Sequence, residues 1–165
     1  GFLLNNEMGD FNKKPGATNT GWGIGTPANV IAPEKRMLSS MSPTIVTRDG
    51  ALRLVTGSPG GRTIPNTTLD VVLGITLFGE DIRAAVDAPR VHHQWMPDEF
   101  HLEAGAARAD VIDMLRGMGH VVKEQPARSQ GDAHSILYDA ATRTATGAHD
   151  KRSADSGARA PRIQD

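Results

Sequence analysis

The fold of this chain is indicated most clearly by residues 43–61, which read PTIVTRDGALRLVTGSPGG. Two runs of strand-forming residues, 43–47 and 51–56, lie on either side of Asp49-Gly50. An Asp-Gly pair between two such runs is the strongest short-range signal for a β-hairpin. The sequence therefore predicts an antiparallel hairpin here.

A glycine-rich turn and a helix follow the hairpin. The turn ends at Gly60 and Gly61, and helical periodicity runs from about Asn66 to Phe78. The apolar face of this helix is predicted to consist of Leu69, Val72, Leu73 and Thr76. Glycines between a strand and a helix let the backbone turn tightly and expose N–H groups that can hold an anion. The pair is thus either a structural turn or an anion site, and the phosphate and dinucleotide motifs are absent.

Helices and strands alternate along the rest of the chain, which predicts an α+β fold or a layered αββα arrangement. Further helices are expected at 81–87 and 107–118, the latter with a buried stripe of Val111, Ile112, Leu115 and Met118, and strands at 100–103, 121–123 and 135–138. Residues 12–33 form a long loop rich in Gly, Pro, Asn and Thr. Residues 151–165 are polar and rich in small side chains, so this tail is expected to be frayed.

Composition narrows the class of partner. The formal net charge is -1, so a small or neutral partner is favoured over nucleic acid.

The chain has no cysteine, which excludes disulfides and thiolate metal sites. His92-His93 and His101 do not predict a metal site, because adjacent histidines on an extended segment point to opposite faces. No apolar run is long enough to cross a membrane.

Two polar clusters precede the hairpin. Glu7 and Asp10 flank a turn, where two carboxylates could hold an ammonium group or be solvated. Ser39-Ser40 follows two basic residues and could accept a carboxylate, or be part of an ordinary loop. Together with the glycine pair, these clusters supply groups for an amine, a carboxylate and an oxyanion. A free amino-acid head next to a carbonyl under attack requires this set.

Three segments in this order, LLNNEMGDF at 3–11, KRMLSSMSPTI at 35–45 and GSPGG at 57–61, resemble the gamma-glutamyltransferases, also called glutathione hydrolases. APRVHHQW at 88–95 is similar to that family as well. The resemblance implies part of an N-terminal nucleophile hydrolase αββα sandwich. It also implies that residues 1–150 are an incomplete small-subunit catalytic domain.

The resemblance further implies roles for seven residues and no cofactor. The substrate's α-amino group would be bound by Glu7 and Asp10, its α-carboxylate by Ser39 and Ser40, and the oxyanion by the amides of Gly60 and Gly61, while Trp22 would lie in the lid. Gly9 and Met37 depart from the family, which usually has an acidic residue and a proline there.

The resemblance implies a precursor that cleaves itself and so exposes a catalytic threonine upstream of Gly1. Gly1 cannot act as a nucleophile. We therefore expect a piece of a longer protein that is inactive alone. Its expected partners are glutathione or another gamma-glutamyl compound and the large subunit of the same precursor. Bacterial members of the family are generally periplasmic or secreted, which is the expected location.

Two alternatives stay open at this point. A cephalosporin-type acylase would use the same nucleophile on another acyl group, although Glu7, Asp10 and Ser39-Ser40 suit an amino-acid head. A remnant without catalysis would serve only in binding or assembly. A threonine at the expected junction would separate the enzyme from the remnant.

Overall fold

The structure, a computed structural model, describes residues 4, 7–12, 14–16, 25–39 and 41–160. The chain divides into two compact units, Gly1–Ser40 and Met41–Asp165. Each unit is described by itself.

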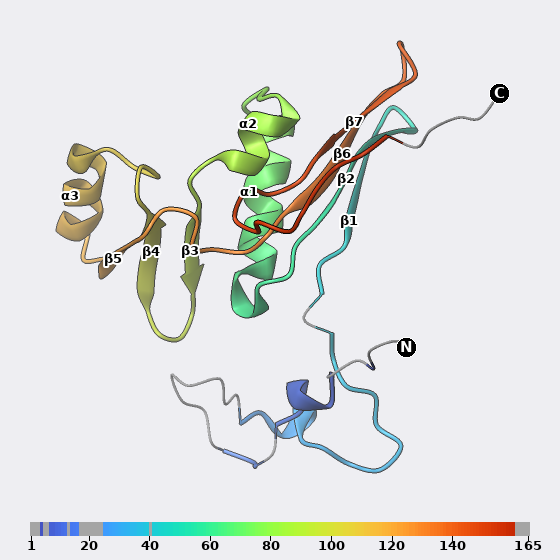
Figure 1. The fold of residues 1–165 in the computed structure, drawn as a ribbon. Coiled ribbons are helices and arrows are strands. Elements are labelled where there is room, and N and C mark those ends of the chain that lie inside the picture. Colours follow the sequence, from blue (N-terminus) through green and yellow to red (C-terminus); the bar gives the residue numbers. More distant parts are fainter. Residues whose placement is uncertain (1–3, 5–6, 13, 17–24, 40, 161–165) are drawn as a thin grey trace. The chain divides into compact units, whose positions relative to one another are not determined.

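The larger unit contains a four-stranded antiparallel sheet (Figure 1). Its strands, in spatial order, are β1 (Thr44–Arg48), β2 (Ala51–Gly57), β6 (His134–Asp139) and β7 (Thr144–Ala148). The predicted hairpin is confirmed, because β1 and β2 pair across a two-residue turn. Asp49 and Gly50 have φ values of 52° and 78°, and two positive φ angles are what a type I′ hairpin turn requires.

Two helices cover one face of this sheet: α1 (Ile64–Thr76) packs on β2, and α2 (Ile82–Asp87) packs on β6 and β7. Both helices were predicted. The carboxylate of Asp81 caps α2 by accepting hydrogen bonds from the backbone N–H groups of Arg83 and Ala84. The core lies between the helices and the sheet, where Leu54, Val71 and Val86 are fully buried.

The predicted buried face of α1 was wrong for Leu69, which is 49% exposed, and for Thr76, which is also exposed. The buried positions are Ile64, Thr67, Thr68, Val71, Gly74 and Ile75. Gly74 lies on this face where the neighbouring helix comes close. A Cβ atom on Gly74 would be only 3.1 Å from the Cβ of Ala85 in α2.

A three-stranded sheet lies on the other side of α1, which contacts both β2 and β3 (Figure 1). It contains β3 (Val91–Gln94), β4 (Glu99–Glu103) and β5 (Val122–Gln125), and β4 and β5 are parallel. Helix α3 (Ala109–Gly117) connects these parallel strands. Of its predicted stripe, Ile112 is buried but Met118 is 69% exposed.

The face of the four-stranded sheet opposite the helices carries an apolar row. Ile45 pairs with Val55, Val55 with Ile136, and Ile136 with Gly147. Ile45, Val55 and Ile136 are 68%, 37% and 48% exposed within this chain. We call these three residues the open apolar row. Residues 157–160 lie beside β6 and β7 here and border a hollow of about 530 Å³.

The described residues of the smaller unit have little regular structure. They form two short 3₁₀ helices, η1 (Glu7–Asp10) and η2 (Pro27–Asn29), and an isolated β-bridge between Asn12 and Val30. Among the described residues of both units, no helix has the length and apolar character needed to cross a membrane.

Candidate functional site

Gly60 and Gly61 form the turn between β2 and α1, as predicted from their position in the sequence. Their φ values are 141° and 59°, a backbone conformation that residues other than glycine rarely adopt. The carbonyl of Gly60 accepts hydrogen bonds from the Oγ1 and the backbone N–H of Thr63, at 2.9 and 3.2 Å. Both glycines are exposed. Exposed amides beside the start of α1 are suited to stabilise a negative oxygen.

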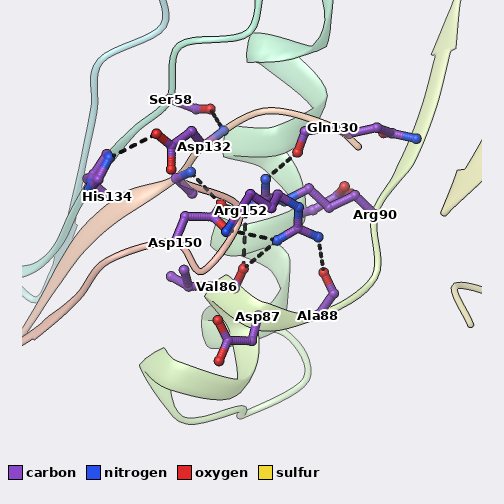
Figure 2. A network of polar contacts seen from close by, with 12 residues as sticks. Ser58, Val86, Asp87, Ala88, Arg90, Gln130, Asp132, His134, Asp150 and Arg152 are labelled. Carbon is purple, nitrogen blue, oxygen red and sulfur yellow. Dashed lines mark hydrogen bonds and ion pairs between the residues drawn. The ribbon is translucent and has the colours of Figure 1, made fainter. Parts of the chain in front are cut away.

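The loop of residues 128–133 packs against this turn, and sequence reasoning did not predict the contact. A Cβ on Gly60 would lie 3.0 Å from the Cα of Gly131. The backbone N–H of Asp132 donates a hydrogen bond to Ser58 Oγ at 2.8 Å (Figure 2). Ser58 Oγ in turn donates to the carbonyl of Pro59 at 2.5 Å. The loop therefore touches the chain on both sides of Pro59.

Four charged side chains form a buried cluster beside the same loop: Arg90, Glu103, Asp150 and Arg152. Figure 2 labels Arg90, Asp150 and Arg152. All four side chains are at most 4% exposed. Arg90 Nη2 lies 2.6 Å from Asp150 Oδ2, and Arg152 Nη2 lies 2.5 Å from Glu103 Oε2. The four formal charges cancel. Opposite charges in such a buried group must remain paired, because an unpaired buried charge is costly.

The cluster also binds the backbone of the loop. The N–H of Gln130 donates to Glu103 Oε1, and the N–H of Ala133 donates to Asp150 Oδ2, each at 2.7 Å. Arg90 Nη1 donates to the carbonyl of Gln130 at 2.5 Å. The loop is thus held on both sides of Gly131.

These contacts shift the pKa of the carboxyl groups. Burial alone would raise the pKa of Glu103, but hydrogen bonds from Arg152 and from the amides of Gln130 and Arg90 outweigh it, so this pKa is lowered. The pKa of Asp150 is lowered in the same way, by the amides of Arg152 and Ala133 and by Arg90. Asp70, on α1, differs: burial raises its pKa to about 6. Glu103 and Asp150 are therefore ionised near neutral pH.

The side chain of Arg152 is buried and ion-paired, whereas residues 151–165 were expected to form a frayed tail. Its guanidinium also donates to the carbonyls of Val86 and Ala88, at 3.2 and 3.0 Å. The sequence of the tail did not reveal this contact, since arginines among polar and small residues ordinarily indicate a solvated segment.

Glu7 and Asp10 share one turn of the smaller unit, η1. The carbonyl of Asp10 accepts a hydrogen bond from Asn29 Nδ2 at 2.7 Å. Asn12 Nδ2 donates to the carbonyl of Thr26 at 2.9 Å, which ties the same segment to η2. These two asparagines were not predicted, and they fix the backbone that carries the two carboxylates.

The remaining predicted site residues are Ser39, Ser40 and Trp22. Ser39 is exposed, while Ser40 and Trp22 lie outside the described residues. Glu7, Asp10 and Ser39 belong to the smaller unit, and Gly60 and Gly61 to the larger one.

The histidines of β3 and β4 are hydrogen-bonded to residues of the sheet, of its connecting turn and of α1. His92 Nδ1 lies 2.7 Å from Asn66 Oδ1, and Nε2 lies 2.9 Å from Gln94 Oε1. Burial lowers the pKa of His92. The part of the chain that the structure describes contains no group of three or more His, Cys, Asp or Glu residues placed to hold a metal ion.

A sheet covered by helices on one face and apolar on the other is one half of an αββα sandwich, here that of an N-terminal nucleophile hydrolase. The family model described as Gamma-glutamyltranspeptidase matches residues 1–160. The chain belongs to this family.

Named relatives agree with this assignment. The chain is 46% identical to the glutathione hydrolase proenzyme of Escherichia coli K12 over 137 residues, which are 83% of this chain and 23% of that protein. It resembles the structure of the Helicobacter pylori gamma-glutamyltranspeptidase T380A mutant with a TM-score of 0.82 and 44% identity, covering 93% of this chain and 82% of that one. For the gamma-glutamyltranspeptidase of Pseudomonas nitroreducens complexed with L-DON, the TM-score is 0.81, the identity 41% and the coverage 98% and 83%. The chain spans about a quarter of the length of the curated relatives it matches.

Proposed function

We propose that the protein containing this chain cleaves gamma-glutamyl amide bonds, chiefly that of glutathione, and passes the glutamyl group to water or to an amine acceptor. The observation that carries the proposal is the family match, which extends over residues 1–160 and includes all three motifs. The nearby relatives are named glutathione hydrolase proenzymes.

In the proposed reaction, a threonine exposed by autocleavage attacks the gamma-glutamyl carbonyl. The carbonyl oxygen becomes negative in the tetrahedral intermediate, and the amides of Gly60 and Gly61 donate hydrogen bonds to it. The amine then leaves, and water or an acceptor amine attacks the threonyl ester in a second step. The positive φ angles and the exposure of both glycines support this role.

The other predicted residues would select the glutamyl head. Glu7 and Asp10 would bind its ammonium group, and Ser39 and Ser40 its carboxylate, while Trp22 would cover the pocket. The side-chain contact from Asn29 supports the assignment of Asp10, because it holds the backbone of the turn in place.

We further propose that residues 1–150 work within one catalytic domain completed by the rest of the precursor, including a large subunit. The open apolar row supports this, since the inner face of a sandwich is apolar and packs on a second sheet about 10 Å away. The proposed location is the periplasm or the medium. Cell fractionation with a cytosolic marker tests it, and co-fractionation with that marker would contradict it.

The function is tested with the complete reading frame. The purified protein is given gamma-glutamyl p-nitroanilide and, as a matched control, glutaryl p-nitroanilide, which lacks the α-amino group. Release of nitroaniline is followed together with subunit cleavage on a gel.

A gamma-glutamyltransferase should cleave the first compound and discriminate strongly against the second, because Glu7 and Asp10 would be left without the ammonium partner that they are proposed to bind. Equal rates on both compounds would favour a cephalosporin-type acylase. An uncleaved and inactive product would favour a remnant without catalysis.

A further inference from the structure

We propose that the loop of residues 128–133 positions the backbone of Gly60 and Gly61, and that the buried cluster of Arg90, Glu103, Asp150 and Arg152 acts on turnover through this loop. The inference rests on the proposed function, since it assigns a task to residues that support the oxyanion amides. None of these residues needs to touch the substrate, so they are positioning residues.

The contact between the loop and the glycine turn is close and leaves no room for adjustment. Gly131 has a φ of 63°, and a Cβ there would lie 2.4 Å from Thr67 Oγ1 and 2.9 Å from Ser58 Oγ. On the other side, the Cα of Gly131 lies 3.0 Å from the place where a Cβ of Gly60 would be. Gly131 is therefore packed between the start of α1 and the glycine turn, and a shift of either is transmitted to the other.

The hydrogen bond from the Asp132 amide to Ser58 Oγ adds a directional link at 2.8 Å. Ser58 also donates to the carbonyl of Pro59, the residue directly before Gly60. This hydroxyl therefore joins the loop to the peptide segment that leads into the proposed oxyanion site.

The charged cluster holds the loop on both sides of Gly131. Glu103 and Arg90 hold Gln130 by its N–H and its carbonyl, and Asp150 holds Ala133 by its N–H. Arg152 bridges the two carboxylates. These hydrogen bonds restrain the loop backbone at three points. Turnover is sensitive to donor placement, because a misplacement of about 1 Å can cost about 100-fold in rate.

The test uses the complete, mature protein and measures kcat and KM for gamma-glutamyl p-nitroanilide, with rates expressed per cleaved subunit. The main variant is Gly131→Ala. Its new Cβ must move from 2.4 Å to at least about 3.4 Å from Thr67 Oγ1, which displaces the loop by about 1 Å. The matched control is Gly79→Ala, at a φ of 69° with nothing within 4 Å of the added Cβ.

Gly131→Ala should lower kcat about 10- to 100-fold and leave KM within about twofold. Gly79→Ala carries the same backbone strain and should keep both constants. A variant Gly131→Ala with a lowered melting temperature but wild-type kcat would overturn the proposal, because the loop would then be structural only.

A second pair keeps the test decisive if Gly131→Ala does not mature. Ser58→Ala removes the hydroxyl oxygen that accepts the hydrogen bond from the backbone N–H of Asp132, whereas Ser58→Thr retains a hydroxyl at this position. We expect a kcat about three- to tenfold lower for Ser58→Ala and nearly unchanged for Ser58→Thr, with KM unaffected in both. Wild-type kcat in both Ser58 variants would overturn the proposal, and a wild-type protein without activity would overturn the proposed function as well.

Discussion

Replacing Asp150 by alanine should loosen the loop of residues 128–133 more than any surface substitution in this chain. Asp150 is fully buried, and its two oxygens accept four hydrogen bonds: from Arg90, from the Ala133 amide, and from the amide and guanidinium of Arg152. The variant would leave two buried arginines with one carboxylate, Glu103. One positive charge would then lack a partner in the interior.

The magnitude follows from that imbalance. Removing one member of a buried charge pair costs about 3–5 kcal/mol, mostly because the other charge stays buried without its partner. At about 1.4 kcal/mol for each factor of ten, this corresponds to a loss of roughly 100- to 4,000-fold in local protection. Asp150→Asn keeps the shape and one acceptor oxygen, so its effect should be smaller.

The loss of protection is measured by hydrogen exchange with mass spectrometry in the complete protein. The relevant peptide is the one that contains Gln130 and Ala133. Asp113→Ala is the matched control, because Asp113 is 76% exposed and only 3.6 Å from Arg116. Removal of an exposed ion pair costs about 0.5 kcal/mol or less. If protection of the loop fell less than about tenfold in Asp150→Ala, the reasoning on the buried cluster would be refuted.

Three further predictions concern the binding groups, the glycine turn and a buried carboxyl group. Asp10→Asn removes a charge partner of the substrate ammonium and should mainly raise KM for the gamma-glutamyl donor; unchanged donor kinetics would remove Asp10 from the site. Gly61→Val places a β-branched residue at a φ of 59° and should lower kcat by about 100-fold by misplacing an oxyanion amide; a normal kcat would refute that role. Burial raises the pKa of Asp70 to about 6 from its ordinary 3.8, so the folded state binds the proton more tightly and stability falls as pH rises from about 4 to 6. Asp70→Asn should therefore raise the melting temperature at pH 8 and leave it unchanged at pH 4, whereas an equal shift at both pH values would contradict the shifted pKa.

The hairpin and α2 could be predicted because their signals are local. Asp49-Gly50 determines its own turn, and Asp81 caps its own helix. Strand β7 was missed since its sequence, TATGA, has no large apolar residue and only Ala148 is buried. An edge strand of this kind is defined by its partner β6, which sequence patterns do not reveal.

The face of α1 was predicted wrongly because periodicity gives weight to large apolar residues. Close packing against α2 requires a small residue at Gly74, and the polar Thr67 and Thr68 are buried on the same helix. Contact between elements, as well as side-chain size, therefore determines which residues of α1 are buried.

The buried cluster gave no sequence signal at all. Charged side chains are mostly exposed, and the members of the cluster come from positions as distant as Arg90 and Asp150. Only the fold brings them together. The roles of Glu7, Asp10, Ser39, Ser40, Gly60 and Gly61 stay predictions, and they derive from motifs and not from packing.

The most direct test of the central claim is to trap the acyl-enzyme. The complete reading frame is sequenced upstream of Gly1 and expressed. The mature protein is then mixed with a gamma-glutamyl donor and quenched in acid, and its intact mass is measured by mass spectrometry. We predict a subunit that begins with threonine, contains this chain and gains the mass of one glutamyl group. A protein that is cleaved but gains no glutamyl adduct and releases no amine would contradict the account.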